Sequence, residues 1–275
     1  MWLIITLKNK PVFDEDTRKK GRTMSLLKKI HPDQSLKELR WFDIGIVTLI
    51  MFGQFIVRST QMYLASLSPS LSTAVSETST NTASEGAAYS SNFTLQIILL
   101  ALAIIYLWIR HFDFKQLPIR LKWSVFFWVP FIFAIMGLFA DMVSTLSGQY
   151  NYFSPQVLAF ISPMAVIDKF MALSPMAIAY GLLNGFYEEF FFLGLLTSVK
   201  DKYKWLVLLF STIVRVSFHT YQGMLWALVI GVVFGLLYYF LYKYKVKNLL
   251  PFFLVHALAD MFGSSLIYLL VNWNY

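Results

Sequence analysis

Residues 184–196 read NGFYEEFFFLGLL and place two adjacent carboxylates, Glu188 and Glu189, inside an otherwise apolar run. Ionisable side chains within a membrane span are costly, and they usually face a bundle interior or a water-filled cavity. We therefore interpret this stretch as a transmembrane helix with functional acids. Neighbouring residues on a helix point about 100° apart, so the two acids cannot face the same way. One is expected to face a cavity and the other a neighbouring helix.

The composition of the whole chain agrees with this interpretation. Of 275 residues, 57% are hydrophobic and only 14% are charged, and the apolar residues form runs long enough to cross a bilayer. This predicts an all-α, polytopic transmembrane helical bundle. The net charge of +8 is typical of cytoplasmic segments beside anionic lipid, and we expect no nucleic-acid partner. The chain has no cysteine, which excludes disulfides, a thiol nucleophile and thiolate metal sites.

Apolar segments and charged connections predict about seven spans. The segments are 42–65, 94–110, 124–146, 171–198, 205–219, 223–242 and 249–271. Basic residues gather in alternate connections, which predicts a cytoplasmic N-terminus and an extracytoplasmic C-terminus. Residues 1–40 are expected to form a basic cytoplasmic or interfacial segment, and residues 41–275 a single bundle. We expect the Ser/Thr-rich loop 66–93 to be flexible and segment 153–166 to be re-entrant or interfacial.

The predicted spans contain a short list of ionisable residues: Arg58, Asp141, Glu188, Glu189, Arg215, His219, His256 and Asp260. Arg58 is expected to snorkel toward the outer interface, and Asp141 to be a structural hydrogen-bond acceptor. The acid and imidazole groups of three other helices lie about 14 to 22 Å from the basic ends of those helices, near mid-membrane. His256 and Asp260 are four residues apart and share a helix face.

Three chemistries fit such a cluster. A carboxylate beside a histidine could take a proton from water and hydrolyse a peptide bond, while a second histidine stabilises the oxyanion. One Glu and two His could instead bind zinc, or the groups could relay protons in a transporter. The sequence has no HExxH, no GxSxG around a serine and no GxGD around an aspartate. No inverted repeat of the kind found in transporters is visible.

The spacing of these residues resembles the CAAX protease and bacteriocin-processing family of intramembrane glutamic proteases, also called the Abi family. Its pattern is EExxxR, then FxxxH, then HxxxN or HxxxD on successive helices. The counterparts here are EEFFFL at 188–193, RVSFH at 215–219 and HALAD at 256–260. The resemblance covers about residues 171–262, the expected protease-like core.

The resemblance implies catalytic roles for Glu188, His219, His256 and Asp260. Glu188 would activate a water with His219 as its partner, and the other two would line the oxyanion side. Glu189 would be structural. The implied mechanism is metal-free and needs no cofactor.

The chain departs from the family pattern at three positions, which makes it a divergent member. Leu193 stands where the pattern has arginine, and Arg215 where it has phenylalanine. The last position is Asp260, which some members share but which, when ionised, cannot donate to an oxyanion. A buried carboxylate without a partner is costly. We therefore expect Arg215 to supply, from the next helix, the cation that Glu189 would otherwise lack.

The predicted function is an intramembrane endopeptidase that acts on a membrane-embedded or lipid-anchored peptide or protein. The alternative is a catalytically inactive scaffold of the same fold, serving bacteriocin self-immunity or cell-surface regulation. The resemblance to bacterial members implies a bacterial plasma membrane. The sequence identifies neither the substrate nor the oligomeric state.

Overall fold

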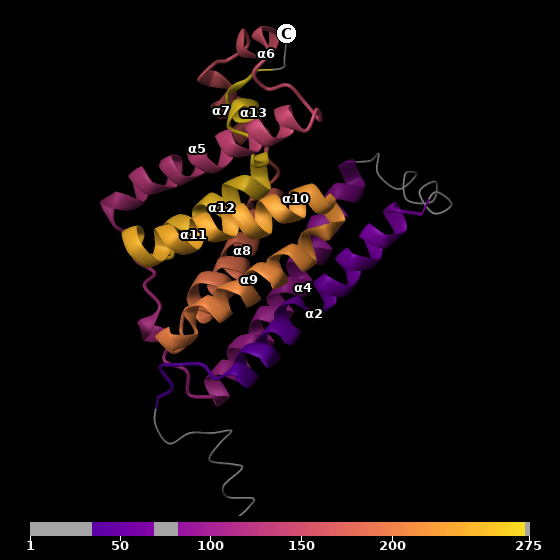
Figure 1. Cartoon of the computed structure of the whole chain (residues 1–275). Helices are drawn as coiled ribbons and strands as arrows, with labels where there is room; N and C mark the ends of the chain where they lie inside the picture. The colour runs from indigo at the N-terminus through magenta and orange to yellow at the C-terminus, as the bar shows by residue number, and fades with distance from the viewer. Residues whose placement is uncertain (1–34, 69–81, 273–275) are drawn as a thin grey trace, which may run out of the picture.

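The computed structural model describes residues 35–68 and 82–272, and most of the predicted N-terminal segment 1–40 lies outside them. Within these ranges the chain is a helical bundle without strands, apart from two isolated bridges (Figure 1). The helices are α2 (Trp41–Ser66), α4 (Thr82–Ile109), η1 (Phe114–Gln116), α5 (Trp123–Leu146), α6 (Pro155–Leu158), α7 (Met164–Ala172), α8 (Pro175–Glu189), η2 (Phe190–Leu195), η3 (Asp201–Tyr203), α9 (Lys204–His219), η4 (Thr220–Gln222), α10 (Met224–Leu228), η5 (Val229–Phe234), α11 (Gly235–Leu241), η6 (Tyr242–Val246), α12 (Leu250–Phe262) and α13 (Leu266–Leu270).

The described residues contain fewer full-length spans than the seven predicted. Four helices are long and apolar enough to cross a membrane, or five when a bent pair counts as one span. The four are α2, the part of α4 from Ala87, α5, and the continuous helix Met224–Val246. Helices α9 and α12 have only 16 and 13 residues, so they extend about 24 and 20 Å and fall short of the hydrocarbon thickness.

The predicted span 171–198 is interrupted near its start. Helices α7 and α8 meet at an angle of 100°. Leu173 and Ser174 are extended between them, and the Ser174 hydroxyl accepts a hydrogen bond from the Ala177 amide while Pro175 occupies the first turn. These are standard helix-start signals. The segment 153–166, predicted to be re-entrant or interfacial, contains the short helix α6 and the start of α7.

The predicted loop 66–93 is partly wrong, because α4 already begins at Thr82. Residues 69–81 of that loop lie outside the described part of the chain. Ala87 and Ala88 are strong helix formers, and Tyr89 packs its ring 5.4 Å from that of Tyr180 on α8. Local composition and packing together extend the helix through a polar stretch.

Helix α8 lies at the centre of the bundle and contacts α4 and α12. Beside it, the Phe52 ring of α2 packs 4.8 Å from the Phe191 ring and 4.9 Å from the Phe218 ring. The basic ends of the helices lie on one side: α2 begins after Arg40, Arg110 follows α4, and α9 begins at Lys204. Figure 1 shows these three ends together at the lower left.

Candidate active site

Helices α8 and α12 approach closely along a seam formed by two glycines, Gly181 and Gly185. A Cβ atom at Gly185 would lie 2.4 Å from the carbonyl oxygen of Phe253 and 2.8 Å from the amide nitrogen of Ala257. Small residues one turn apart let helix backbones pack together in membranes. Glu189 follows Gly185 by four residues and therefore lies on the same face. The seam brings Glu189 toward α12.

Glu189 is fully buried and both of its carboxylate oxygens are bonded. Arg215 donates from Nη1 to Oε1 at 3.0 Å and from Nη2 to Oε2 at 2.6 Å. The Nδ1–H of His256 also donates to Oε1, at 2.8 Å. The guanidinium lies 3.9 Å from the centre of the Phe192 ring. The predicted pairing of Arg215 with Glu189 is thus confirmed, and the pair joins α8 to α9.

Glu188 faces another direction and lines a pocket. Its Oε1 accepts a hydrogen bond from Asn184 Nδ2 at 3.2 Å, whereas Oε2 is buried without a hydrogen-bond partner. The Nε2 atom of His256 lies 3.6 Å from that oxygen, beyond hydrogen-bonding distance. The two acids therefore have different surroundings, as expected. Both oxygens of Glu189 accept hydrogen bonds from neighbouring helices, whereas one oxygen of Glu188 has no hydrogen-bond partner.

Sequence reasoning missed Asn184 and Gln96. The Asn184 amide also donates to Asp260 Oδ2 at 2.9 Å, and its oxygen accepts from Gln96 Nε2 at 2.5 Å. Asn184 Nδ2 thereby bridges the carboxylates of Glu188 and Asp260. One signal was available: Asn184 precedes Glu188 by four residues, so they share a helix face. Gln96 had none, because a single amide in an apolar helix is usually structural.

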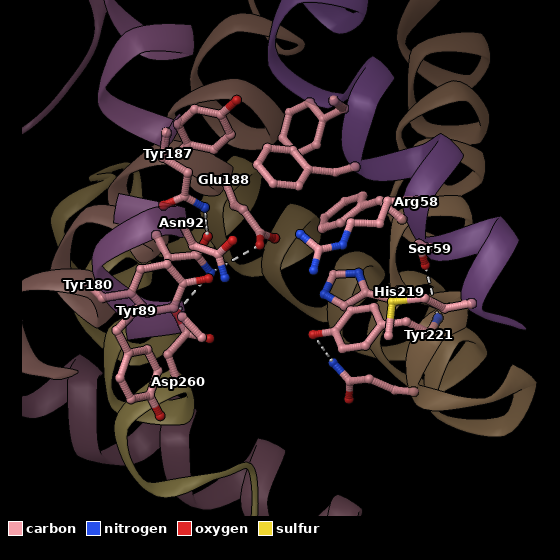
Figure 2. Close-up of a pocket in the computed structure, with 18 of the residues that line it drawn as sticks. Arg58, Ser59, Tyr89, Asn92, Tyr180, Tyr187, Glu188, His219, Tyr221 and Asp260 are labelled. Carbon is pink, nitrogen blue, oxygen red and sulfur yellow. Dashed lines mark hydrogen bonds between the residues drawn. The ribbon is translucent and has the colours of Figure 1, made fainter. Parts of the chain in front are cut away.

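His219 lies on the opposite wall of the pocket from Glu188 (Figure 2). Its Nδ1 atom is 2.8 Å from the carbonyl oxygen of Arg215. A carbonyl only accepts, so Nδ1 carries the proton, and in the neutral ring Nε2 is an acceptor. No hydrogen bond joins His219 to Glu188 among the described residues, so the predicted partnership requires a molecule between them.

The pocket has a volume of about 570 Å³. It is lined by Phe52, Phe55, Arg58, Ser59, Met62, Ala88, Tyr89, Asn92, Gln96, Tyr180, Asn184, Tyr187, Glu188, Phe218, His219, Tyr221, Gln222, Ala259 and Asp260. Most of these residues come from the halves of α2, α4, α9 and α12 that are remote from the basic ends, and the others belong to α8 and η4. The pocket is therefore on the side of the bundle away from the Lys- and Arg-rich connections.

Two other predicted groups have clear places. Arg58, which the sequence analysis expects to snorkel toward the outer interface, is an exposed residue, and its side chain lines the pocket and points into it (Figure 2). Asp141 is a structural acceptor, as predicted: it is buried and bonded to the Ser265 hydroxyl and, at 2.9 Å, to the Ile267 amide. His256 and Asp260 share a face, with Nε2 and Oδ1 3.9 Å apart.

One group of side chains has the spacing of a metal site. Ligand atoms of Glu188, Glu189 and His256 lie within 4.8 Å of one another. Both Glu189 oxygens are already bonded to Arg215, and a guanidinium repels a cation. The zinc set considered from sequence, one Glu and two His, would include His219, which is not in this group. The residues therefore fit a metal ion poorly, and no chemical step is assigned to one.

Comparison with known proteins gives one family. Residues 170–262 match the model described as "Rce1-like: Type II CAAX prenyl endopeptidase Rce1-like". No curated protein and no solved structure matches the chain. The matched residues run from α7 to the end of α12 and include the two acids, Arg215 and both histidines. Over these residues the chain is similar to the CAAX protease-like, Rce1-like family, which agrees with the resemblance found in the sequence.

Proposed function

We propose that this membrane protein is an intramembrane endopeptidase that hydrolyses a peptide bond with a water activated by Glu188. One observation carries the proposal: the Oε2 atom of Glu188 is buried without a hydrogen-bond partner, and Glu188 lines a pocket whose opposite wall holds His219. A buried acceptor without a partner is costly unless a bound molecule satisfies it. A water between Glu188 and His219 would supply that bond.

The chemistry follows from this arrangement. Glu188 removes a proton from the water while the water oxygen forms a bond to the scissile carbonyl carbon. The carbonyl π electrons move to its oxygen, giving a tetrahedral oxyanion. As the C–N bond breaks, that electron pair re-forms the carbonyl, and Glu188 returns its proton to the leaving nitrogen. His219 Nε2 accepts a hydrogen bond from the other O–H of the water. This bond orients a lone pair of the water oxygen toward the carbonyl carbon.

In this proposal Glu189, Arg215 and His256 position the reacting acid. The bidentate Arg215 fork and the His256 bond fix Glu189 rigidly. Since Glu189 is the next residue after Glu188, the same contacts fix the backbone from which Glu188 projects. Asp260 acts through Asn184, whose second N–H holds Glu188 Oε1. These four residues are positioning groups.

We further propose the orientation predicted from charge, with the N-terminus cytoplasmic in a bacterial plasma membrane. The pocket then opens on the extracytoplasmic side, and the substrate is a membrane-embedded or lipid-anchored peptide. Because the chain has no cysteine, single-cysteine labelling tests this directly. An impermeant maleimide added to intact cells should label Asn92→Cys but label Lys202→Cys only after permeabilisation. The reverse pattern would contradict the orientation.

The activity test uses purified protein in liposomes with a randomised pool of internally quenched peptides bearing palmitoyl or farnesyl anchors. Glu188→Gln and His219→Ala should each lower cleavage about 10²–10⁴-fold. The matched control Glu38→Gln, at an exposed acid outside the pocket, should cleave like wild type. Equal cleavage by wild type and Glu188→Gln would end the proposal.

An inactive scaffold of the same fold is the second candidate. It is favoured by Asp260, a carboxylate that accepts a bond from Asn184 and so offers no proton to an oxyanion. A scaffold in bacteriocin self-immunity or cell-surface regulation would keep its biological effect in both the Glu188→Gln and His219→Ala variants. Loss of that effect in parallel with peptide cleavage would favour the protease.

A further inference from the structure

The proposed reaction needs a donor for the oxyanion, and the residues expected from the family pattern do not provide one. Asp260 accepts a hydrogen bond from Asn184, as a carboxylate does. His256 directs Nδ1–H to Glu189 and is not among the residues that line the pocket. The ring proton of His219 is held by the Arg215 carbonyl. Each of these groups is occupied or is an acceptor.

Both N–H groups of the Asn184 amide are also used, by Glu188 and Asp260. The Tyr221 hydroxyl accepts a hydrogen bond from Gln222 Nε2 at 2.9 Å. Its own O–H is a neutral donor, and a neutral donor binds an anion less strongly than a charged one. The pocket thus has two carboxylates on its inner wall and no cation from the matched region 170–262. A negative charge developing on the substrate there would be repelled unless positive charge came from another part of the chain.

Arg58 is the one Lys or Arg among the residues that line this pocket. It belongs to α2, outside the matched region. Its guanidinium points into the pocket, toward the space between the walls that carry Glu188 and His219 (Figure 2). Within the described part of the chain, no hydrogen bond or ion pair engages it. A guanidinium carries five N–H donors, cannot accept, and stays protonated.

We propose that Arg58 is a catalytic residue that binds the oxyanion of the tetrahedral intermediate, an inference that rests on the proposed function. As the water oxygen bonds to the carbonyl carbon, the π electrons move to the carbonyl oxygen, and Arg58 N–H groups donate to it. When the C–N bond breaks, the electrons return to the carbonyl and the bonds to Arg58 weaken. Preorganised donors at such a site act mainly on the transition state.

The experiment measures kcat and KM for Arg58 variants on the peptides that wild type cleaves from the anchored pool. The peptides are remade with amidated C-termini and without acidic residues, so that they carry no carboxylate. Arg58→Ala should lower kcat about 10²–10³-fold with little change in KM. Arg58→Lys should keep part of the activity, and guanidinium added to the medium should partly restore Arg58→Ala. The control Gln61→Ala, exposed on the same helix outside the pocket, should match wild type.

Three results would overturn the inference: an unchanged kcat for Arg58→Ala, a rise in KM alone, or a loss confined to peptides that retain a carboxylate. The last two would make Arg58 a ground-state substrate contact. A thermal unfolding midpoint equal to wild type separates these effects from misfolding. If wild type and Glu188→Gln cleave equally, the proposed function itself is wrong. If Glu188→Gln is inactive and Arg58→Ala is normal, only the role of Arg58 is wrong.

Discussion

Two buried ion pairs in this bundle have nearly the same chemistry and different surroundings. Asp43 on α2 accepts from Arg110 Nε at 2.6 Å, from the Tyr106 hydroxyl at 2.7 Å and from the Arg40 amide at 3.1 Å. Glu189 on α8 is likewise saturated, by Arg215 and His256. In both pairs the guanidinium also lies over a phenylalanine ring, that of Phe42 or Phe192.

The difference lies beside the pairs. Next to Glu189 stands Glu188, with one buried oxygen that has no hydrogen-bond partner. At the α2–α4 pair, both Asp43 oxygens have donors, and no residue of that pair lines the pocket. A buried ion pair alone is therefore a poor indicator of function, since it also serves to join helices. An unmatched polar atom facing a cavity next to the pair is a better one.

The largest expected effect comes from breaking each pair in turn. Arg215→Met and Arg110→Met should each destabilise the fold by about 3–5 kcal/mol, because each leaves a buried carboxylate without its guanidinium partner. Only Arg215→Met should also lower kcat per folded molecule, by about 100-fold, since it releases the backbone beneath Glu188. Denaturation in detergent and peptide cleavage measure the two quantities. Equal kcat values for both variants would contradict the distinction.

Replacing both partners of a pair sharpens the comparison. Asp43→Leu with Arg110→Met should restore stability to near the wild-type value, because a well-packed apolar pair avoids the desolvation cost. The donors that lose Asp43 belong to half-buried Tyr106 and exposed Arg40, which can bond to water instead. Glu189→Leu with Arg215→Met should remain about 1–3 kcal/mol below wild type, since His256 then loses its acceptor. Chemical denaturation of the single and double variants gives both values. Full recovery at both sites would show that His256 does not depend on Glu189.

The glycine seam between α8 and α12 offers a smaller effect. Gly185→Ala should cost about 1–3 kcal/mol, because its Cβ would overlap the Phe253 carbonyl. The matched control is Gly45→Ala on α2, where a Cβ meets nothing within 4 Å; removing a helical glycine there should stabilise by up to about 1 kcal/mol. Thermal unfolding compares the two. A neutral Gly185→Ala would mean that the helices separate easily.

The smallest effect belongs to an exposed pair on the basic side. Lys243 donates to Asp201 at 3.1 Å, and this hydrogen bond, with the attraction of the ammonium, holds the pKa of Asp201 below its ordinary value. The contribution is present above the ordinary pKa of about 3.9 and is lost as pH falls through the lowered pKa. Asp201→Asn should lower the unfolding midpoint barely at pH 7, and the difference should vanish in acid. A difference that grew on acidification would contradict this.

Much of the site followed from spacing along the chain, because acids and histidines in apolar helices are rare and their depth can be counted. The division between Glu188 and Glu189 was predictable in this way. The pairing with Arg215 was predicted from the family resemblance, because Leu193 stands where the pattern has arginine. The direction of Arg58 was not, since snorkelling and a turn into a cavity look alike in sequence. Asn184, Gln96 and the Asp43–Arg110 pair were missed because neutral amides, and charges at predicted span ends, are common without function.

The helix boundaries were harder to predict from the sequence than the site residues. Hydropathy counts apolar residues and does not detect that α9 and α12 are short, or that Ser174 and Pro175 start a new helix at a steep angle. Packing of Tyr89 against Tyr180 extends α4 into a stretch whose composition favours a loop. The early start of α4 thus reflects a contact between segments distant in sequence, whereas the break before α8 comes from local signals that a hydropathy count ignores.

The contact between Gly185 and Phe253 also determines which of two chemically identical residues is the open acid. Exchanging Glu188 and Glu189 would require rotating α8 by about 100° about its own axis. Such a rotation would turn Gly185 away from α12 and bring a side chain against the Phe253 carbonyl, where even a Cβ would lie at 2.4 Å. The rotational register of α8 is thus set one turn before the acids, and a glycine with no polar side chain assigns each glutamate its environment.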